Sequence, residues 1–183
     1  MIPISKEILD KASRGDMAAF EEIYKLSCDF VYNVALRITR NSADAQEVAQ
    51  DVFMKIYRSL NDFQFRSAFK TRVYRITVNT AINRYRKSAR ESKGRVDYES
   101  IAATTADSRS TLDGLVRNDD EQRINTLLAA LSPQFKACLV LREIEGLSYR
   151  EIADSLKIPV NTVRSRLKRA RQALLAQARK ELN

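Results

Sequence analysis

Apolar side chains recur at helical spacing along most of the chain, and the pattern is clearest near its end, between residues 147 and 175. Ser148 followed by Glu151 is a capping box, in which each side chain accepts a hydrogen bond from an amide that the first helical turn leaves open. Pro159 suits the first position of a second helix, because its fixed φ fits there and its missing N–H costs nothing. The apolar positions of that second helix fall on one line: Val163, Leu167, Ala170 and Leu174. Two short helices of this kind predict a helix-turn-helix.

The outer face of the second helix is basic. Between Asn161 and Arg171 the sequence has five Lys or Arg residues and no acid, so the helix lacks the acidic partners that a merely solvated face usually carries. The helical pattern alone fits a solvated hairpin as well as it fits a DNA-binding one. The charge favours duplex DNA as the ligand.

Helical periodicity also covers the first half of the chain. Residues 1–40 predict two helices, the first ended by Gly15 and the second capped by Asp16. A third helix over residues 44–60 has an acidic outer side, which is either solvated surface or a protein-docking face. That side carries Asp44, Glu47, Gln50, Asp51 and Met54. A fourth helix over residues 70–90 turns one apolar face inward and a polar, basic stripe outward. The stripe consists of Arg72, Arg75, Asn79, Asn83, Arg86 and Arg90.

An aromatic loop precedes that fourth helix. Phe63, Phe65 and Phe69 lie within seven residues of one another, next to basic side chains. Such rings either plug the junction between helices or stack on single-stranded bases. The sequence leaves both uses open.

Charge and composition divide the chain into two helical parts. Residues 62–95 carry ten basic and two acidic side chains, a net +8, and residues 135–183 carry a net +6. An acidic, Ser- and Thr-rich stretch separates them and is typical of a linker. The chain has only four Gly and three Pro, so we expect an all-α fold. Two small helical domains, over residues 1–93 and 119–183, should be joined by a flexible linker over residues 94–118. The second domain should contain the helix-turn-helix.

The residue inventory argues against catalysis. The chain has no His, the commonest general base and metal ligand, and no GxxxxGK or GxGxxG loop to hold a nucleotide. Cys28 and Cys138 each fall in an apolar helical pattern and are expected as two buried thiols. We therefore predict no enzyme, no metal and no cofactor. The net charge of +9 indicates a polyanionic partner, and the lack of a long apolar run predicts no membrane insertion and a cytoplasmic protein.

Two segments resemble bacterial sigma factors. Residues 44–86, DAQEVAQDVFMKIYRSLNDFQFRSAFKTRVYRITVNTAINRYR, resemble their second region. Residues 131–171, LSPQFKACLVLREIEGLSYREIADSLKIPVNTVRSRLKRAR, resemble their fourth. The small size and the bare linker between the segments resemble the extracytoplasmic-function class. The resemblance is specific because two independent motifs occur in the right order and separation.

The resemblance implies a protein without catalytic activity that joins core RNA polymerase and directs it to promoters, and that an anti-sigma factor holds inactive. Carried over by position, the polymerase-binding residues are Glu47, Gln50, Asp51 and Met54. The residues that open the −10 element and hold an unstacked base are Phe63, Phe65, Phe69, Arg72, Arg75, Asn79, Asn83 and Arg86. The residues that read the −35 element as duplex DNA are Asn161, Thr162, Arg164, Ser165, Lys168, Arg169 and Arg171.

Two residues depart from the family pattern. The family usually has Trp where this chain has Arg72, and Gly where it has Phe65. Both departures bear on the shape of the base-capturing loop.

Two other functions compete with the sigma-factor hypothesis. A stand-alone regulator would use the helix-turn-helix but would leave the basic stripe between Arg72 and Arg90 without a purpose. A nucleic-acid-processing enzyme would need a cluster of carboxylates to bind a metal, and the acids here are scattered over helix exteriors.

Overall fold

The computed structural model describes residues 4–60, 69–94, 128 and 131–181 of the chain. Within these ranges every regular element is a helix and none is a strand, which confirms the all-α prediction. The helices are α1 (Lys6–Ser13), α2 (Met17–Thr39), α3 (Ser42–Leu60), α4 (Phe69–Gly94), α6 (Pro133–Leu139), the π-helical turn η2 (Val140–Ile144), α7 (Tyr149–Leu156) and α8 (Val160–Glu181). The predicted linker lies, apart from Gly94, outside the described residues, as do Phe63 and Phe65.

Local capping determines where the early helices end. Gly15 has a φ of +90°, which glycine adopts without strain, and it separates α1 from α2. Asp16 then accepts hydrogen bonds from the amides of Ala18 and Ala19 at 2.9 and 3.1 Å. Both features agree with the sequence prediction.

Pro159 lies one position earlier than predicted. α8 begins at Val160, and the carbonyl of Pro159 accepts the amide of Thr162 at 2.9 Å. Pro159 therefore precedes the first helical residue and acts as the helix cap, because its carbonyl already takes part in the first turn.

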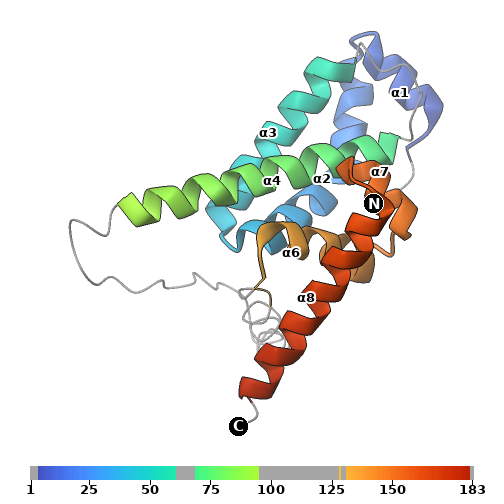
Figure 1. Cartoon of the computed structure of the whole chain (residues 1–183). Coiled ribbons are helices and arrows are strands. Elements are labelled where there is room, and N and C mark those ends of the chain that lie inside the picture. The colour runs from blue at the N-terminus through green and yellow to red at the C-terminus, as the bar shows by residue number, and fades with distance from the viewer. Residues whose placement is uncertain (1–3, 61–68, 95–127, 129–130, 182–183) are drawn as a thin grey trace, which may run out of the picture.

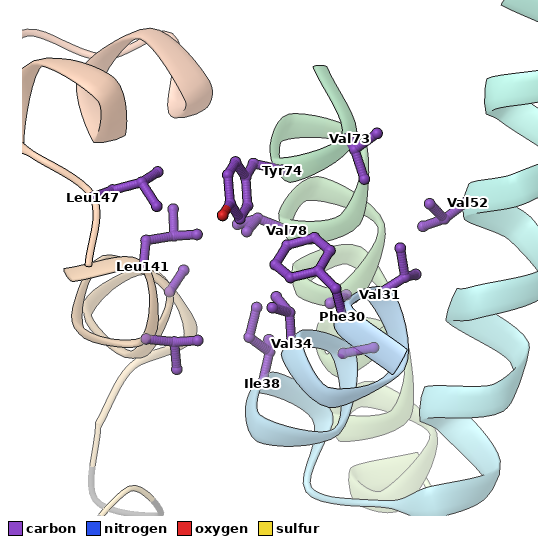
Figure 2. Close-up of a cluster of buried hydrophobic side chains, with 14 of the residues drawn as sticks. Phe30, Val31, Val34, Ile38, Val52, Val73, Tyr74, Val78, Leu141 and Leu147 are labelled. Carbon is purple, nitrogen blue, oxygen red and sulfur yellow. The ribbon is translucent and has the colours of Figure 1, made fainter. Parts of the chain in front are cut away.

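The helices form two groups that pack against each other. α2, α3 and α4 pack together with α1 at one end, and α6, η2, α7 and α8 form the second group. In Figure 1, α7 lies beside the N-terminal end of α4, and α6 lies near its middle. The buried side chains of both groups form one continuous apolar cluster. In Figure 2, Leu141 and Leu147 of the second group face Tyr74, Val34 and Ile38 of the first.

The two cysteines are only partly as expected. Both are free thiols, and Cys138 is buried. Cys28 is half-buried instead of buried, because its position on α2 lies at the edge of the apolar face. Neither forms a disulfide.

Candidate nucleic-acid interface

The helix-turn-helix has the predicted geometry. The amide of Ser148 donates to Glu151 Oε2 at 2.7 Å, and the amide of Glu151 donates to Ser148 Oγ at 3.2 Å. The backbone hydrogen bond from Ser148 lowers the pKa of the Glu151 carboxyl. Val163, Leu167 and Ala170 are fully buried, so their burial fixes which side of α8 faces outward.

The outer face of α8 presents its polar side chains to solvent. The exposed residues are Asn161, Arg164, Ser165, Lys168, Arg169 and Arg171, while Thr162 is half-buried. Arg164 Nη1 donates to Asn161 Oδ1 at 3.2 Å, which orders the start of this face. Arg171 Nη2 instead contacts Glu143 Oε1 of η2 at 2.7 Å. Arg171 thus has an acidic partner from another element, which no pattern within the α8 sequence reveals.

At one end of the basic stripe of α4 the side chains hydrogen-bond to backbone carbonyls of the same chain, and at the other end they are exposed. Arg72 Nη2 donates to the carbonyl of Ser59 at 2.9 Å, across the ends of the aromatic loop. Arg75 Nη2 and Nε donate to the carbonyls of Asp154 and Ser155 at 2.9 and 3.3 Å. The exposed members are Asn79, Asn83, Arg86 and Arg90.

Phe69 is the one member of the predicted aromatic set that the structure describes. Its ring is buried in the core at the start of α4. Of the two uses that the sequence left open, this position corresponds to plugging the helix junction. We therefore do not carry Phe69 forward as a base-contacting residue.

A cleft separates the exposed end of the stripe from the second group of helices. Its volume is about 350 Å³, and Asn79, Asn83 and Arg86 line it on the α4 side. Arg166 and Ile158 line the opposite side, and no carboxylate is among the described residues around it. The cleft is therefore polar and basic.

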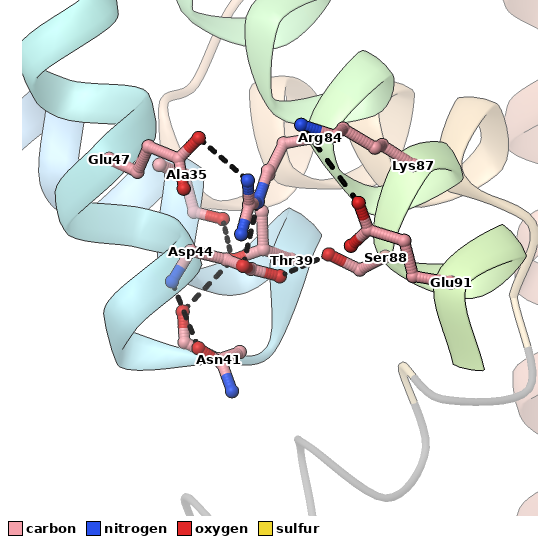
Figure 3. Close-up of polar contacts among 9 residues, drawn as sticks. All are labelled: Ala35, Thr39, Asn41, Asp44, Glu47, Arg84, Lys87, Ser88 and Glu91. Atoms are coloured by element: carbon pink, nitrogen blue, oxygen red, sulfur yellow. Dashed lines mark hydrogen bonds and ion pairs between the residues drawn. The ribbon is translucent and has the colours of Figure 1, made fainter. Parts of the chain in front are cut away.

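The acidic face of α3 is partly held by α4. Arg84 Nε contacts Asp44 Oδ1 at 2.7 Å, and Arg84 Nη1 contacts Glu47 Oε1 at 2.6 Å, as Figure 3 shows. Ser88 Oγ donates to the other oxygen of Asp44 at 2.8 Å. Asp44 was predicted on the outer side and is instead buried, because α4 covers it with these two donors. The remaining members of the predicted docking face, Gln50, Asp51 and Met54, are exposed.

One lysine has an unusual environment. Lys136 is fully buried on α6, and its Nζ has no hydrogen-bond partner among the described residues. The ammonium lies 5.2 Å from the centre of the Tyr85 ring of α4. Burial, and secondarily the charge of Arg40, lower its pKa to about 8.

Comparison with known proteins assigns the family. Residues 23–91 match the family described as Sigma-70 region 2, and residues 121–174 match Sigma-70, region 4. The RNA polymerase sigma-H factor of Pseudomonas aeruginosa is 34% identical, over 92% of this chain and 91% of that protein. The ECF RNA polymerase sigma-E factor of Escherichia coli K12 is also 34% identical, over 91% and 90%. The chain belongs to the ECF class of RNA polymerase sigma factors.

Solved structures share the fold of this sigma factor. CnrH, solved with the cytosolic domain of CnrY, superposes with a TM-score of 0.70 at 22% identity, over 94% of this chain and 96% of that one. RpoE of Bartonella quintana, solved with the anti-sigma factor NepR, gives 0.66 at 24% identity, over 87% and 96%. Among the described residues of this sigma factor, no helix is long and apolar enough to cross a membrane, and no group of side chains is arranged to hold a metal ion.

Proposed function

We propose that this sigma factor joins core RNA polymerase and uses α8 to read the −35 element and α4 to open the −10 element. The observation that carries the proposal is the presence of two separate basic helices, α4 and α8, each with an exposed polar face. A stand-alone regulator needs only α8. A sigma factor needs both, because it must recognise duplex DNA and also hold a separated strand.

The start of α8 is suited to reading base edges. Arg164 and Lys168 stand one turn apart on the exposed face, near the N-terminal end that enters the major groove in helix-turn-helix proteins. A guanidinium or ammonium there reaches the acceptors of guanine. Arg169, which at 100° per residue points to a different side of the exposed face from Arg164 and Lys168, is assigned to phosphate.

The exposed end of α4 is suited to a separated strand. Asn79 provides an amide able to hydrogen-bond a base edge, and Asn83 and Arg86 follow it along the same face. Opening DNA costs a few kcal/mol per flipped base, so a protein without ATP hydrolysis offsets that cost by binding the exposed base and backbone.

The α3 face is assigned to the polymerase. Glu47, Gln50, Asp51 and Met54 project from the side opposite the buried line of α3. Arg84 holds the carboxylate of Glu47, whereas Gln50 and Asp51 have open access to a partner.

The remaining assignments follow the family. We assign no catalytic activity and place the protein in the cytoplasm with the polymerase. An anti-sigma factor is the expected regulator, as the solved complex of RpoE with NepR suggests.

The test of this function begins with reconstitution. Purified core polymerase with the sigma factor should support promoter-dependent run-off transcription that core polymerase alone lacks.

Gln50→Ala with Asp51→Ala should weaken binding to core polymerase about tenfold or more, equivalent to about 1.4 kcal/mol, without changing the melting temperature. The matched control is Glu21→Ala with Glu22→Ala, two exposed acids on α2. A double variant at 50 and 51 that competes as well as the control would disprove the docking assignment.

A further inference from the structure

Arg171 of α8 has a carboxylate partner from another helical element. Its Nη2 lies 2.7 Å from Glu143 Oε1 of η2. Hydrogen bonds with Glu143 first and with Tyr149 second raise the pKa of the Arg171 guanidinium. Tyr149 is the first residue of α7. The guanidinium is therefore held between η2 and the start of α7, although the sequence predicted it among the residues that meet DNA.

The position of Arg171 on α8 is suited to a DNA phosphate. At about 100° and about 1.5 Å per residue, Arg171 lies within about 20° of Arg164 around the helix axis and about 10 Å farther along it. The proposed function places Arg164 at base edges in the major groove, which is about 12 Å wide. A side chain on the same side of the helix, two turns later, comes near the sugar-phosphate backbone that borders the groove.

Glu143 competes with such a phosphate for the same donor. Carboxylate and phosphate oxygens both accept charge-assisted hydrogen bonds from a guanidinium, with similar geometry. In the structure the Glu143 carboxylate already occupies Nη2 of Arg171. A phosphate that approached Arg171 would also meet the negative charge of Glu143 and be repelled. Glu143 thus takes the place of the phosphate and opposes its entry.

The ion pair is not what holds this part of the fold together. The side chains of Arg171 and Glu143 are 48% and 50% exposed, and exposed ion pairs add little to stability because water screens them. η2 is fixed instead by the buried side chains of Val140 and Leu141. We therefore expect the fold to tolerate the loss of the Glu143 charge.

We propose that Glu143 is an intramolecular competitor for DNA phosphate, which holds Arg171 and so lowers the affinity of α8 for duplex DNA. The proposal rests on the proposed function, because it requires α8 to bind duplex DNA. Phosphate contacts supply sequence-independent affinity, whereas base contacts supply discrimination. Glu143 removes one contact of the first kind and leaves the base contacts assigned to Arg164 and Lys168 untouched.

Glu143→Gln tests the proposal, because it removes the charge and keeps the shape of the side chain. The measurement is the affinity of the full-length chain for a fluorescein-labelled duplex of mixed sequence, at several salt concentrations between about 50 and 200 mM. At the lowest salt Glu143→Gln should tighten binding about fivefold. It should also steepen the slope of log affinity against log salt by about 0.9, the value for one additional phosphate contact. Glu143→Ala should behave in the same way.

The matched control is Glu21→Gln on α2. Glu21 forms an exposed ion pair of 2.6 Å with Lys25, so its substitution also frees a cation and adds one positive charge to the chain. No DNA contact is assigned to this part of α2. The control should therefore stay within about twofold of the wild type and keep its salt slope.

A double-mutant cycle separates a specific contact from a general effect of charge. Arg171→Gln should cost at least about three times more affinity in the Glu143→Gln chain than in the wild type, because only a freed guanidinium reaches phosphate. An equal cost in the two backgrounds would overturn the proposal, since Glu143 would then act through net charge alone. Unchanged or weaker binding by Glu143→Gln would overturn it as well. Thermal melting followed by circular dichroism verifies that all four chains are folded.

Arg169→Ala distinguishes a failure of this proposal from a failure of the proposed function. If Arg169→Ala weakens binding and flattens the salt slope while Glu143→Gln changes neither, α8 binds duplex DNA and only the role of Glu143 is wrong. If neither substitution changes affinity or slope, α8 does not bind the duplex, and the proposed function of α8 fails together with the competition by Glu143.

Discussion

Arg84 joins two helices that are assigned to different partners. Its guanidinium lies between Asp44 and Glu47 of α3, while the outer face of its own helix is assigned to DNA. Asp44 is almost completely buried, so its carboxylate depends on Arg84 and Ser88 for compensation. A buried carboxylate that loses its cation retains the full cost of desolvation.

We expect Arg84→Met to destabilise the fold by about 2 kcal/mol, because it keeps the apolar stem and leaves Asp44 buried without its cation. Urea denaturation followed by circular dichroism measures this change. The control is Lys87→Met, which breaks only an exposed contact of 3.9 Å with Glu91 and should cost less than about 0.5 kcal/mol. Equal unfolding midpoints for the two variants would mean that Asp44 does not need the guanidinium.

The sequence did not predict which residues of other helices contact the charged side chains of the site. Asp44 falls on the polar side of a helical pattern, yet its partner Arg84 stands 40 residues away. Arg171 appears unpaired within α8, yet Glu143 lies 28 residues before it. Arg75 belongs to an outward stripe, yet it contacts carbonyls 79 and 80 residues away. Periodicity assigns a residue to a face of its own helix, and only the packing shows what covers that face.

Helices were predicted well because their ends are determined locally. Asp16, Gly15 and the Ser148 capping box each act within about one turn of their own position, so the sequence contains the whole cause. The π-helical turn at Val140–Ile144 is different. The amide of Glu145 reaches the carbonyl of Val140 at 3.1 Å, a wider turn inside an apolar run that the periodicity treats as continuous helix.

Two arginines of α8 permit a test that separates sequence-specific base recognition from non-specific electrostatic attraction to DNA. Arg164→Ala should lose discrimination at particular −35 base pairs, by about 1 to 3 kcal/mol, because the proposed function assigns this exposed side chain to base edges. Arg169→Ala should weaken every sequence alike and reduce the slope of log affinity against log salt by about one, because it removes one phosphate contact. Both residues are exposed on α8, so neither change should alter the melting temperature.

Holoenzyme binding to a panel of −35 variants at several salt concentrations measures both effects. Lys157→Ala, at an exposed lysine in the turn before α8, tests whether any lost cation has the same consequence. An equal loss on all −35 variants for Arg164→Ala and Arg169→Ala would contradict the division of roles.

At the scale of the whole molecule, composition predicted two helical groups but not their contact. Residues 1–93 and residues 135–183 each carry a net charge of +6, which would keep the groups apart by repulsion. The apolar surface around Tyr74 and Leu141 and the neutral carbonyl acceptors of Arg75 outweigh that repulsion in the structure. Lys136 allows this balance between apolar packing and charge to be measured, since its ammonium is buried against the Tyr85 ring of α4.

Folding stability should therefore respond to pH through Lys136. In the folded chain burial lowers the pKa of Lys136 from its ordinary 10.5 to about 8, and the Arg40 cation at the end of α2 adds to the effect. The folded state disfavours the charged form, so the contribution of Lys136 to stability is least below pH 8, where the residue is protonated in the folded and the unfolded chain, and it rises as pH increases toward 10.5.

Between pH 7 and 9 the free energy of unfolding of the wild type should rise by about 1 kcal/mol more than that of Lys136→Met, because the variant has no proton to lose at this position. Lys136→Met should also be the more stable chain at pH 7, since methionine keeps the apolar stem and removes the buried charge. Urea denaturation of both chains at the two pH values decides the matter: an equal pH dependence in the wild type and in Lys136→Met excludes Lys136 as a destabilising buried cation.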